Sequence, residues 1–203
     1  MRKEFIHAIK NHQTAFDVEL PDEVVERLAD FYDLIREYNP LLHLVGPCSP
    51  EEFAVRHILE SLTLLEYLPA GAKFTDVGAG AGLPSLPCVL VREGLKAVLI
   101  ESKEKKAAFL ARAVNSLGIL ERTWIVNRQF EEATANDCHF VTCRALDRFI
   151  EKLPKLIRWS GKRKMLLFGG PKLGEALRAC RVHFSSALMP MSRQRFLFVS
   201  DRS

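Results

Sequence analysis

The chain is poor in cysteine and has no long apolar run. Its 203 residues include five cysteines, none of which forms a Cys-x-x-Cys pair, and its six histidines have no ligand spacing with them. An odd number of unpaired cysteines argues against a disulfide framework, and the missing spacing predicts that there is no metal site. No apolar stretch approaches the roughly 18–20 residues that a membrane helix needs. We therefore expect a reduced, cytoplasmic protein without a membrane partner.

The sequence also lacks a strong excess of one charge and the signatures of several enzyme classes. Its 29 Lys and Arg residues nearly balance its 25 Asp and Glu residues, which gives a net charge of +4. This mild basicity permits a nucleic-acid partner but does not establish one. There is no Gly-x-Ser-x-Gly elbow and no Walker loop, which argues against those hydrolases and nucleotidases. The segment Met1–Phe5 has neither the apolar core nor the cleavage site of a secretory signal.

Residues 1–70 have the apolar spacing of helices and show no strand signal. Apolar positions three or four residues apart predict a helix over residues 21–38, and Pro40 predicts that this helix stops at the preceding residue. The run Ser49-Pro50-Glu51-Glu52 is a capping box that opens another helix. Residues 1–16 are expected to form a further short helix. We interpret this region as a helical extension that packs over the cleft of the domain that follows.

Residues 71–203 change to strands that alternate with helices. Strands are predicted near residues 73–77, 96–101, 123–127, 139–143, 164–168, 181–187 and 195–200. Helices are predicted near residues 84–92, 103–117, 147–158 and 171–179. Alternation of this kind predicts an α/β domain with a mostly parallel seven-stranded sheet that helices cover on both faces. No helix fits between the last two strands, so we expect them to pair antiparallel.

Three glycines, Gly78, Gly80 and Gly82, alternate after the first strand. A strand, a glycine turn and a helix let the backbone approach a cofactor closely. Asp76 at the strand end would repel a pyrophosphate but suits the cationic amine and sulfonium of S-adenosylmethionine. Glu101 ends the next strand, where a carboxylate can bind a ribose diol. The glycines alone fit an ordinary turn, whereas the glycines with both carboxylates predict a Rossmann-like, S-adenosylmethionine-binding methyltransferase fold.

Basic residues at two places favour an anionic partner, and each has a structural alternative. Lysines at 103, 105 and 106 begin a helix, where they oppose the helix dipole unless a phosphate lies nearby. The alternative is a solvated helix face. Arg144 follows the fourth strand at the carboxyl edge of the sheet, where it could clamp a carboxylate, a phosphate or a guanine. The alternative is a structural ion pair, for example with Asp147.

Several motifs along residues 30–170 together resemble one known family. They are Tyr38-Asn39, His57-Ile58-Leu59-Glu60-Ser61-Leu62, the run from Asp76 to Pro87 with its two prolines, Glu101-Ser102, Lys105-Lys106, Phe109-Leu110 and Arg144-Ala145. The chain is similar in these motifs to the bacterial 16S ribosomal RNA guanine-N7 methyltransferase G family, also called glucose-inhibited division protein B. The resemblance implies methyl transfer from S-adenosylmethionine to guanine N7 in 16S ribosomal RNA. The implied partner is that RNA or the small ribosomal subunit, and a monomer is expected.

The motif and the resemblance together give a set of expected site residues. The cofactor-binding residues are expected to be Asp76, Gly78, Gly80, Gly82, Leu83, Glu101, Ser102, Phe130, Glu131 and Arg144. The resemblance implies that Phe130 and Glu131 border the adenine and that Arg144 contacts the cofactor or the target. Asn39 and His43 are, with Arg144, the candidates for the catalytic region that shapes the guanine pocket. His57 is a further candidate, and a core position explains it equally well.

The chain departs from the family pattern in four positions and one segment. His43 and Val45 stand where the family usually has Asn and Thr, Glu60 where it has Asp, and Gly169 where it has Lys. Residues 127–132 are shifted by about one position relative to the family pattern. Three other functions stay open: a methyltransferase of the same fold for a small molecule or protein, a nicotinamide-dependent oxidoreductase, and a non-catalytic ribosome-binding factor. Asp76 and the glycine spacing argue against the oxidoreductase.

Overall fold

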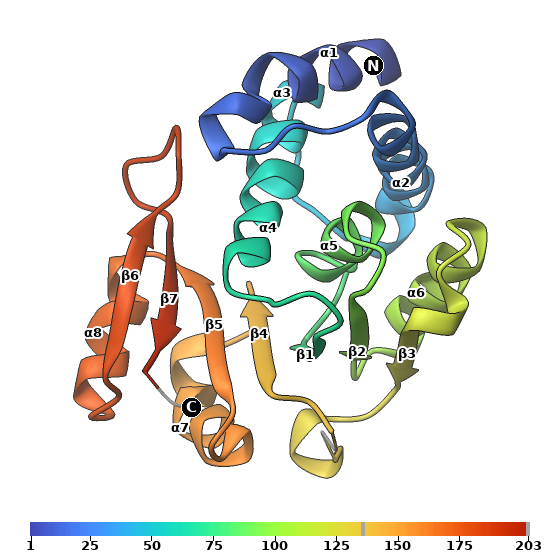
Figure 1. Ribbon diagram of the computed structural model, residues 1–203. Coiled ribbons are helices and arrows are strands. Elements are labelled where there is room, and N and C mark those ends of the chain that lie inside the picture. Colours follow the sequence, from blue (N-terminus) through green and yellow to red (C-terminus); the bar gives the residue numbers. More distant parts are fainter. Residues whose placement is uncertain (135–136, 202–203) are drawn as a thin grey trace.

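The computed structural model describes residues 1–134 and 137–201, which form a seven-stranded sheet between two layers of helices (Figure 1). The strand order is β3-β2-β1-β4-β5-β7-β6, and β7 runs antiparallel to the other six strands. The strands are β1 Lys73–Val77, β2 Lys96–Ile100, β3 Thr123–Val126, β4 Phe140–Arg144, β5 Lys164–Gly169, β6 Phe184–Leu188 and β7 Phe196–Ser200. The predicted α/β class, the seven strands and the antiparallel last pair are therefore confirmed.

Helices cover both faces of the sheet because its central strands are apolar on both sides. On β5, Leu166 and Phe168 join one hydrophobic cluster, and Met165 and Leu167 join the other. In Figure 1 the strands run from β6 on the left to β3 on the right, and the helices of the first cluster lie toward the β3 side while those of the second lie toward the β6 side. The first set includes α5 Ser85–Val91 and α6 Glu104–Ser116, and the second consists of α7 Phe149–Ser160 and α8 Pro171–Ala179.

The first 66 residues are helical, as predicted, and they share the first hydrophobic cluster with the sheet. The helical segments are α1 Arg2–His12, η1 Gln13–Phe16, α2 Asp22–Leu42, α3 Pro50–Phe53, η2 Ala54–Leu59, α4 Glu60–Leu62 and η3 Thr63–Glu66. Short 3₁₀ turns, η4 Leu120–Arg122 and η5 Phe130–Glu132, flank β3. None of the helices in the described ranges combines the length and apolar character needed to cross a bilayer.

The predicted end of the helix at Pro40 is wrong, because α2 continues through Pro40 to Leu42. Proline disfavours a helical conformation in the residue before it, but local hydrogen bonds outweigh that preference here. The Asn39 side chain donates to the carbonyl of Val45 and accepts from its N–H, at 3.1 and 2.9 Å. His43, with φ of 46°, caps the helix by donating its N–H to the carbonyl of Asn39. Asn39 therefore holds the chain that follows the helix.

The helical run from Pro50 to Glu66 contains a π-helical segment, η2, directly above the carboxyl end of β4. Ser49 caps this run as predicted: its hydroxyl accepts from the Glu52 N–H, and the Glu52 carboxylate accepts from the Ser49 N–H. The wider π turn changes which side chains of the run face the sheet. His57 within it and Glu60 directly after it both face the sheet edge where β4 ends.

Candidate functional site

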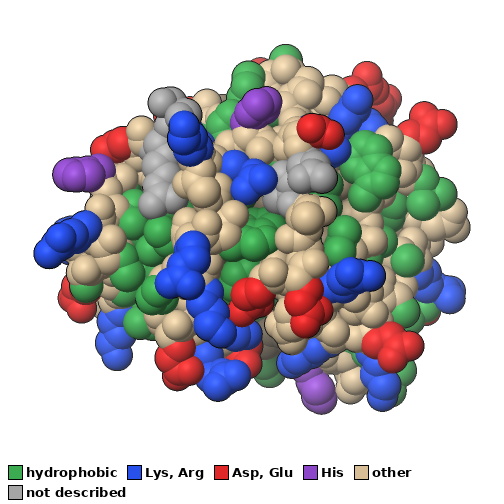
Figure 2. Space-filling model, turned by 90° about the horizontal axis from the view of Figure 1, so that it is seen from below, with side chains coloured by type: hydrophobic (Ala, Val, Ile, Leu, Met, Phe, Trp, Pro, Cys, Tyr) green, Lys and Arg blue, Asp and Glu red, His purple; other side chains and the backbone are tan. Residues whose placement is uncertain are grey.

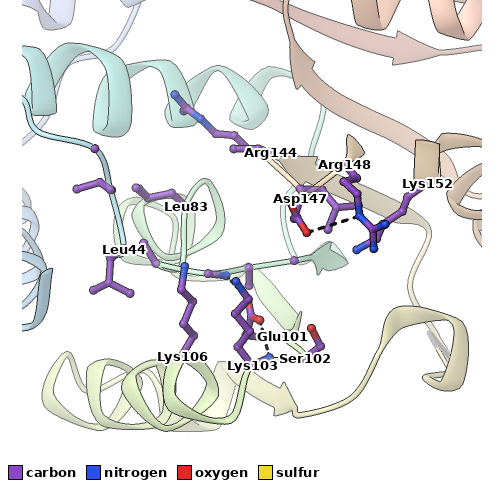
Figure 3. Close-up of a pocket in the computed structure, with 18 of the residues that line it drawn as sticks. Leu44, Leu83, Glu101, Ser102, Lys103, Lys106, Arg144, Asp147, Arg148 and Lys152 are labelled. Atoms are coloured by element: carbon purple, nitrogen blue, oxygen red, sulfur yellow. Dashed lines mark hydrogen bonds and ion pairs between the residues drawn. The ribbon is translucent and has the colours of Figure 1, made fainter. Parts of the chain in front are cut away.

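The carboxyl ends of β1, β2 and β4 open into a cavity of about 560 Å³. Open α/β sheets bind ligands at this edge. The cavity wall includes six of the residues predicted from the sequence: Gly78, Gly80, Leu83, Glu101, Ser102 and Arg144. They follow the ends of β1 and β2 or, for Arg144, end β4, and Figure 3 shows Leu83, Glu101, Ser102 and Arg144 around the cavity. The structure thus brings together the parts of the chain on which the cofactor prediction rests.

The glycine loop exposes its backbone to the cavity at Gly78 and Gly80, which have no side chain. Gly78 and Gly80 have φ of 72° and 52°, values that favour glycine. A Cβ on Gly78 would lie 2.6 Å from Leu146 Cδ1 in the opposite wall. Gly82 does not line the cavity; a Cβ there would clash with Leu86, so this glycine lets the loop pack on α5.

Glu101 connects the glycine loop to the start of the next helix. One carboxylate oxygen accepts from the Gly80 N–H at 2.9 Å, and the other accepts from the Lys103 N–H at 2.8 Å. The side chain is buried, yet it forms part of the cavity wall. Each carboxylate oxygen has a second lone pair, so Glu101 can accept two further hydrogen bonds from a diol.

Asp76 lies behind the glycine loop and is not part of the cavity wall. The Ser85 hydroxyl donates to its Oδ2 at 2.6 Å, and its Oδ1 has no partner among the described residues. Burial, with a smaller contribution from Glu101, raises the pKa of Asp76 from 3.8 to about 7. The structure therefore places this carboxyl under the loop and does not show the direct contact with the cofactor's amine that the sequence predicts.

Arg144 forms its ion pair with Glu60, and the alternative pair with Asp147 is not present. Its Nη2 donates to Glu60 Oε2 at 3.2 Å and also to the carbonyl of Arg56. The guanidinium lies 5.3 Å from the centre of the Phe168 ring. Its Nη1 is buried and has no hydrogen-bond partner in the described ranges. Arg144 thus joins the cavity to the helix above it (Figure 3).

The two predicted catalytic candidates from the helical extension lie away from the cavity wall. Asn39 is occupied by the Val45 backbone, and His43 lines a smaller neighbouring cavity of about 360 Å³. His57 does line the main cavity. Burial, together with Arg144, Arg56 and Arg195, lowers its pKa from 6.5 to about 3, so its imidazole is neutral at physiological pH.

The residues expected to border the adenine also lie outside the cavity wall. Phe130 is buried, with its ring edge-on to Trp159, and Glu131 pairs with Lys155 at 3.6 Å. Gln129, one position earlier, does line the cavity. Residues 127–132 are shifted by about one position against the family pattern. Applying this shift to Phe130 would have pointed to Gln129 as a residue of the wall.

Basic side chains face each other across the cavity. Lys103 and Lys106 rise from the start of α6, and Arg148 and Lys152 come from the start of α7 on the other side (Figure 3). Arg148 was missed in the sequence, where Lys152 stands out only as one of many scattered basic residues. Net charge gives little guidance to the position of a binding surface. On the face seen in Figure 2, basic side chains are spread out, with acidic ones between them.

Known structures define the class of this fold. A SAM-dependent methyltransferase from Aquifex aeolicus aligns with a TM-score of 0.57 over 75% of this chain and 93% of that chain, at 17% identity. The B. subtilis tRNA methyltransferase TrmK aligns with a TM-score of 0.56 over 71% of this chain and 65% of that chain, at 18% identity. At such low identity these likenesses establish the fold only, which is that of S-adenosylmethionine-dependent methyltransferases.

Sequence relatives define the family. The family model "GidB: rRNA small subunit methyltransferase G" matches residues 24–187. The ribosomal RNA small subunit methyltransferase G of Sorangium cellulosum is 34% identical over 91% of this chain and 77% of its own length. The protein of the same name from Halorhodospira halophila is 34% identical over 85% of this chain and 78% of its own length. The chain belongs to this methyltransferase family, which confirms the resemblance noted in its motifs.

Replacing Gly80 with Asp should weaken cofactor binding by about a hundredfold. The new carboxylate would lie beside Glu101 in the cavity, and an unpartnered charge in such a place costs on the order of 3 kcal/mol. That corresponds to about a hundredfold loss of affinity. Calorimetric titration with S-adenosylhomocysteine measures it. Gly118→Asp is the matched control, because Gly118 also has positive φ, at 67°, with open space around it. Unchanged affinity in Gly80→Asp would show that the loop does not bind the cofactor.

Replacing Asp76 with Asn should remove a pH dependence of folding stability. Because the pKa of Asp76 is raised to about 7 in the folded state, folding takes up a proton between about pH 4 and 7. The stability of the wild type relative to Asp76→Asn should therefore fall by about 4 kcal/mol as pH rises through this range. Urea unfolding measures the change, of which about 2.5 kcal/mol falls between pH 5 and pH 8. The exposed Asp147→Asn serves as the control, and a pH-independent difference for Asp76→Asn would contradict the burial effect.

Proposed function

We propose that this cavity transfers a methyl group from S-adenosylmethionine to N7 of a guanine in 16S ribosomal RNA. The observation that carries the proposal is the combination of a bare glycine backbone and a buried carboxylate, Glu101, in one wall of a cavity with basic rims on both sides. The glycines and Glu101 suit a nucleoside cofactor, and the lysines suit a polyanion. The family to which the chain belongs supports the same reaction.

The chain's own residues would hold the cofactor by its nucleoside. Glu101 is placed to accept from the two ribose hydroxyls while it also fixes the backbone of Gly80. Ser102 and Gln129 lie in the same part of the cavity wall and are the polar groups next to that ribose position. Asp76 would act from behind the loop, through Ser85 and the backbone. Phe130 would support the adenine side from the core beside Gln129.

The reaction at guanine N7 needs no general base. N7 carries an in-plane lone pair and no proton, so the reaction does not depend on a catalytic His and Asp pair. When bound, S-adenosylmethionine supplies a sulfonium methyl group, whose bond to sulfur breaks as the N7 lone pair forms the new bond. The protein's task is then to hold the purine in line and exclude water. His57, neutral at physiological pH, adds no charge to this position.

The basic rims would bind the RNA backbone around the target nucleotide. Lys103 and Lys106 on α6 lie opposite Arg148 and Lys152 on α7, so a strand entering the cavity would have cations on both sides. Lys106 Nζ also donates to the His43 carbonyl at 3.4 Å, and both residues line the smaller cavity. In this proposal the protein works as a cytoplasmic monomer on 16S ribosomal RNA or on the small subunit.

Methylation of isolated ribosomal subunits tests the function. Small subunits from cells that lack the protein are incubated with the purified protein and S-adenosylmethionine, and the 16S RNA is mapped by nuclease digestion and mass spectrometry. We expect one guanine to gain a methyl group, with none gained with Gly80→Asp or with large subunits. Transfer only to small molecules or proteins would contradict the RNA target. Cofactor binding without transfer to any acceptor would favour a non-catalytic ribosome-binding factor.

Replacing Lys152 with Gln should weaken RNA binding and reduce its salt dependence. Loss of one phosphate contact lowers the slope of log K against log salt by about 0.7–0.9. Filter binding to 16S RNA between low and physiological salt measures the slope. Lys162→Gln removes the same charge from the opposite edge of the sheet, before β5, and should leave the slope unchanged. Equal slopes for the two variants would argue against the basic rim as the RNA site.

A further inference from the structure

Glu60 is a buried acid that bridges two arginines from different parts of the sheet. Its side chain is 1% exposed. Oε1 accepts from Nε of Arg195 at 2.6 Å, and Oε2 accepts from Nη2 of Arg144 at 3.2 Å. Arg144 ends β4, and Arg195 directly precedes β7. A single carboxylate on the helical run from Pro50 to Glu66, the covering helix, therefore holds both cations at the sheet edge.

The bridge leaves Arg144 with little freedom. Its guanidinium lies over the Phe168 ring, and Nη2 also donates to the carbonyl of Arg56 in the π-helical segment. The side chain is only 14% exposed, although it forms part of the cavity wall. A guanidinium fixed on several sides presents its remaining donor group in one orientation. Here that group is Nη1, which is buried without a partner among the described residues.

The charge of Arg144 presents a problem for the proposed reaction. The purine becomes cationic as its N7 bond to the methyl group forms. A cation in the same cavity wall opposes this change, and the opposition is strong where water is excluded. The basic residues of the rims can reach solvent, but Arg144 lies under the helix. Arg56 on that helix has its own acidic partner, Glu52, at 3.7 Å. Among the described residues, Glu60 is the acid whose carboxylate contacts Arg144 directly.

We propose that Glu60 is a positioning residue that fixes the guanidinium of Arg144 and offsets part of its charge beside the guanine that becomes cationic. This inference rests on the proposed function and extends it to a residue outside the cavity wall. The neutral imidazole of His57 supports it, because no further positive charge is added at this side of the cavity. Arg195 holds the second carboxylate oxygen and so keeps Glu60 oriented.

Two substitutions at position 60 separate charge from shape. Glu60→Gln keeps the size of the side chain and loses its charge, whereas Glu60→Asp keeps the charge and shortens the reach. We measure single-turnover methylation of small subunits, RNA affinity and S-adenosylhomocysteine affinity. If Glu60 acts by its charge, Glu60→Gln lowers the single-turnover rate about tenfold or more, with RNA affinity unchanged or tighter. Glu60→Asp, which carries the residue usual in the family, keeps a clearly higher rate than Glu60→Gln.

The matched control is Glu51→Gln, which removes the same charge from an exposed position on α3. Its rate should equal that of the wild type. Glu60→Gln can fail to fold, because it leaves two arginines without their acid. In that case the double variant Glu60→Gln/Arg195→Gln, which removes one charge of each sign, is measured in place of Glu60→Gln. Glu60→Asp should again have the higher single-turnover rate.

Several results would overturn the proposal. A Gln variant as fast as the wild type, or faster than the Asp variant, would show that Glu60 serves packing only. A loss of RNA affinity in proportion to the loss of rate would show that it serves binding. A wild type that methylates no small subunit refutes the proposed function itself, whereas an active wild type with an equally active Glu60→Gln refutes this inference alone.

Discussion

The two hydrogen bonds that the Glu101 carboxylate accepts set the geometry of the whole site. They join the N–H of Gly80, after β1, to the N–H of Lys103, before α6. The carbonyl of Ile100, one residue earlier, accepts from the N–H groups of Gly78 and Ala79. The end of β2 therefore holds the glycine loop at three points, and a loop with positive φ values keeps one conformation. A ligand that binds there meets a preformed surface.

Three charged side chains are buried in the described part of the chain, and all are acids near this cavity: Glu60, Asp76 and Glu101. Buried charges are costly unless hydrogen bonds or counter-charges compensate them, so each needs its own explanation. Glu101 has backbone N–H groups and Glu60 has two arginines. Asp76 has only the Ser85 hydroxyl, and its pKa is accordingly raised to about 7. The solvent-facing rims of the cavity carry the opposite charge.

Much of the site could be predicted because it follows from local rules. The glycines and Glu101 stand at strand ends, and adjacent parallel strands bring their ends together, so their meeting needed no knowledge of side-chain packing. The position of Asp76 could not be read in the same way, because both faces of β1 are buried and its apolar pattern does not say where an acid on it points. Asn39 lies outside the cavity wall because its side chain is held by the Val45 backbone, and hydrogen bonds to the loop after α2 cannot be read from the sequence.

The covering helix shows where sequence reasoning needed three-dimensional structure. Glu60 stands between the buried Leu59 and Leu62, and an acid among buried apolar residues signals a buried partner. Its partners come 84 and 135 residues later in the chain, so no local pattern identifies them. Gly78, Gly80 and Glu101 belong to the sheet domain, and the helical run adds His57 to the same cavity wall and Glu60 beside Arg144. Residues of the N-terminal region and of the sheet domain therefore line one cavity. In the proposed function, cofactor binding and target chemistry would depend on different parts of that wall.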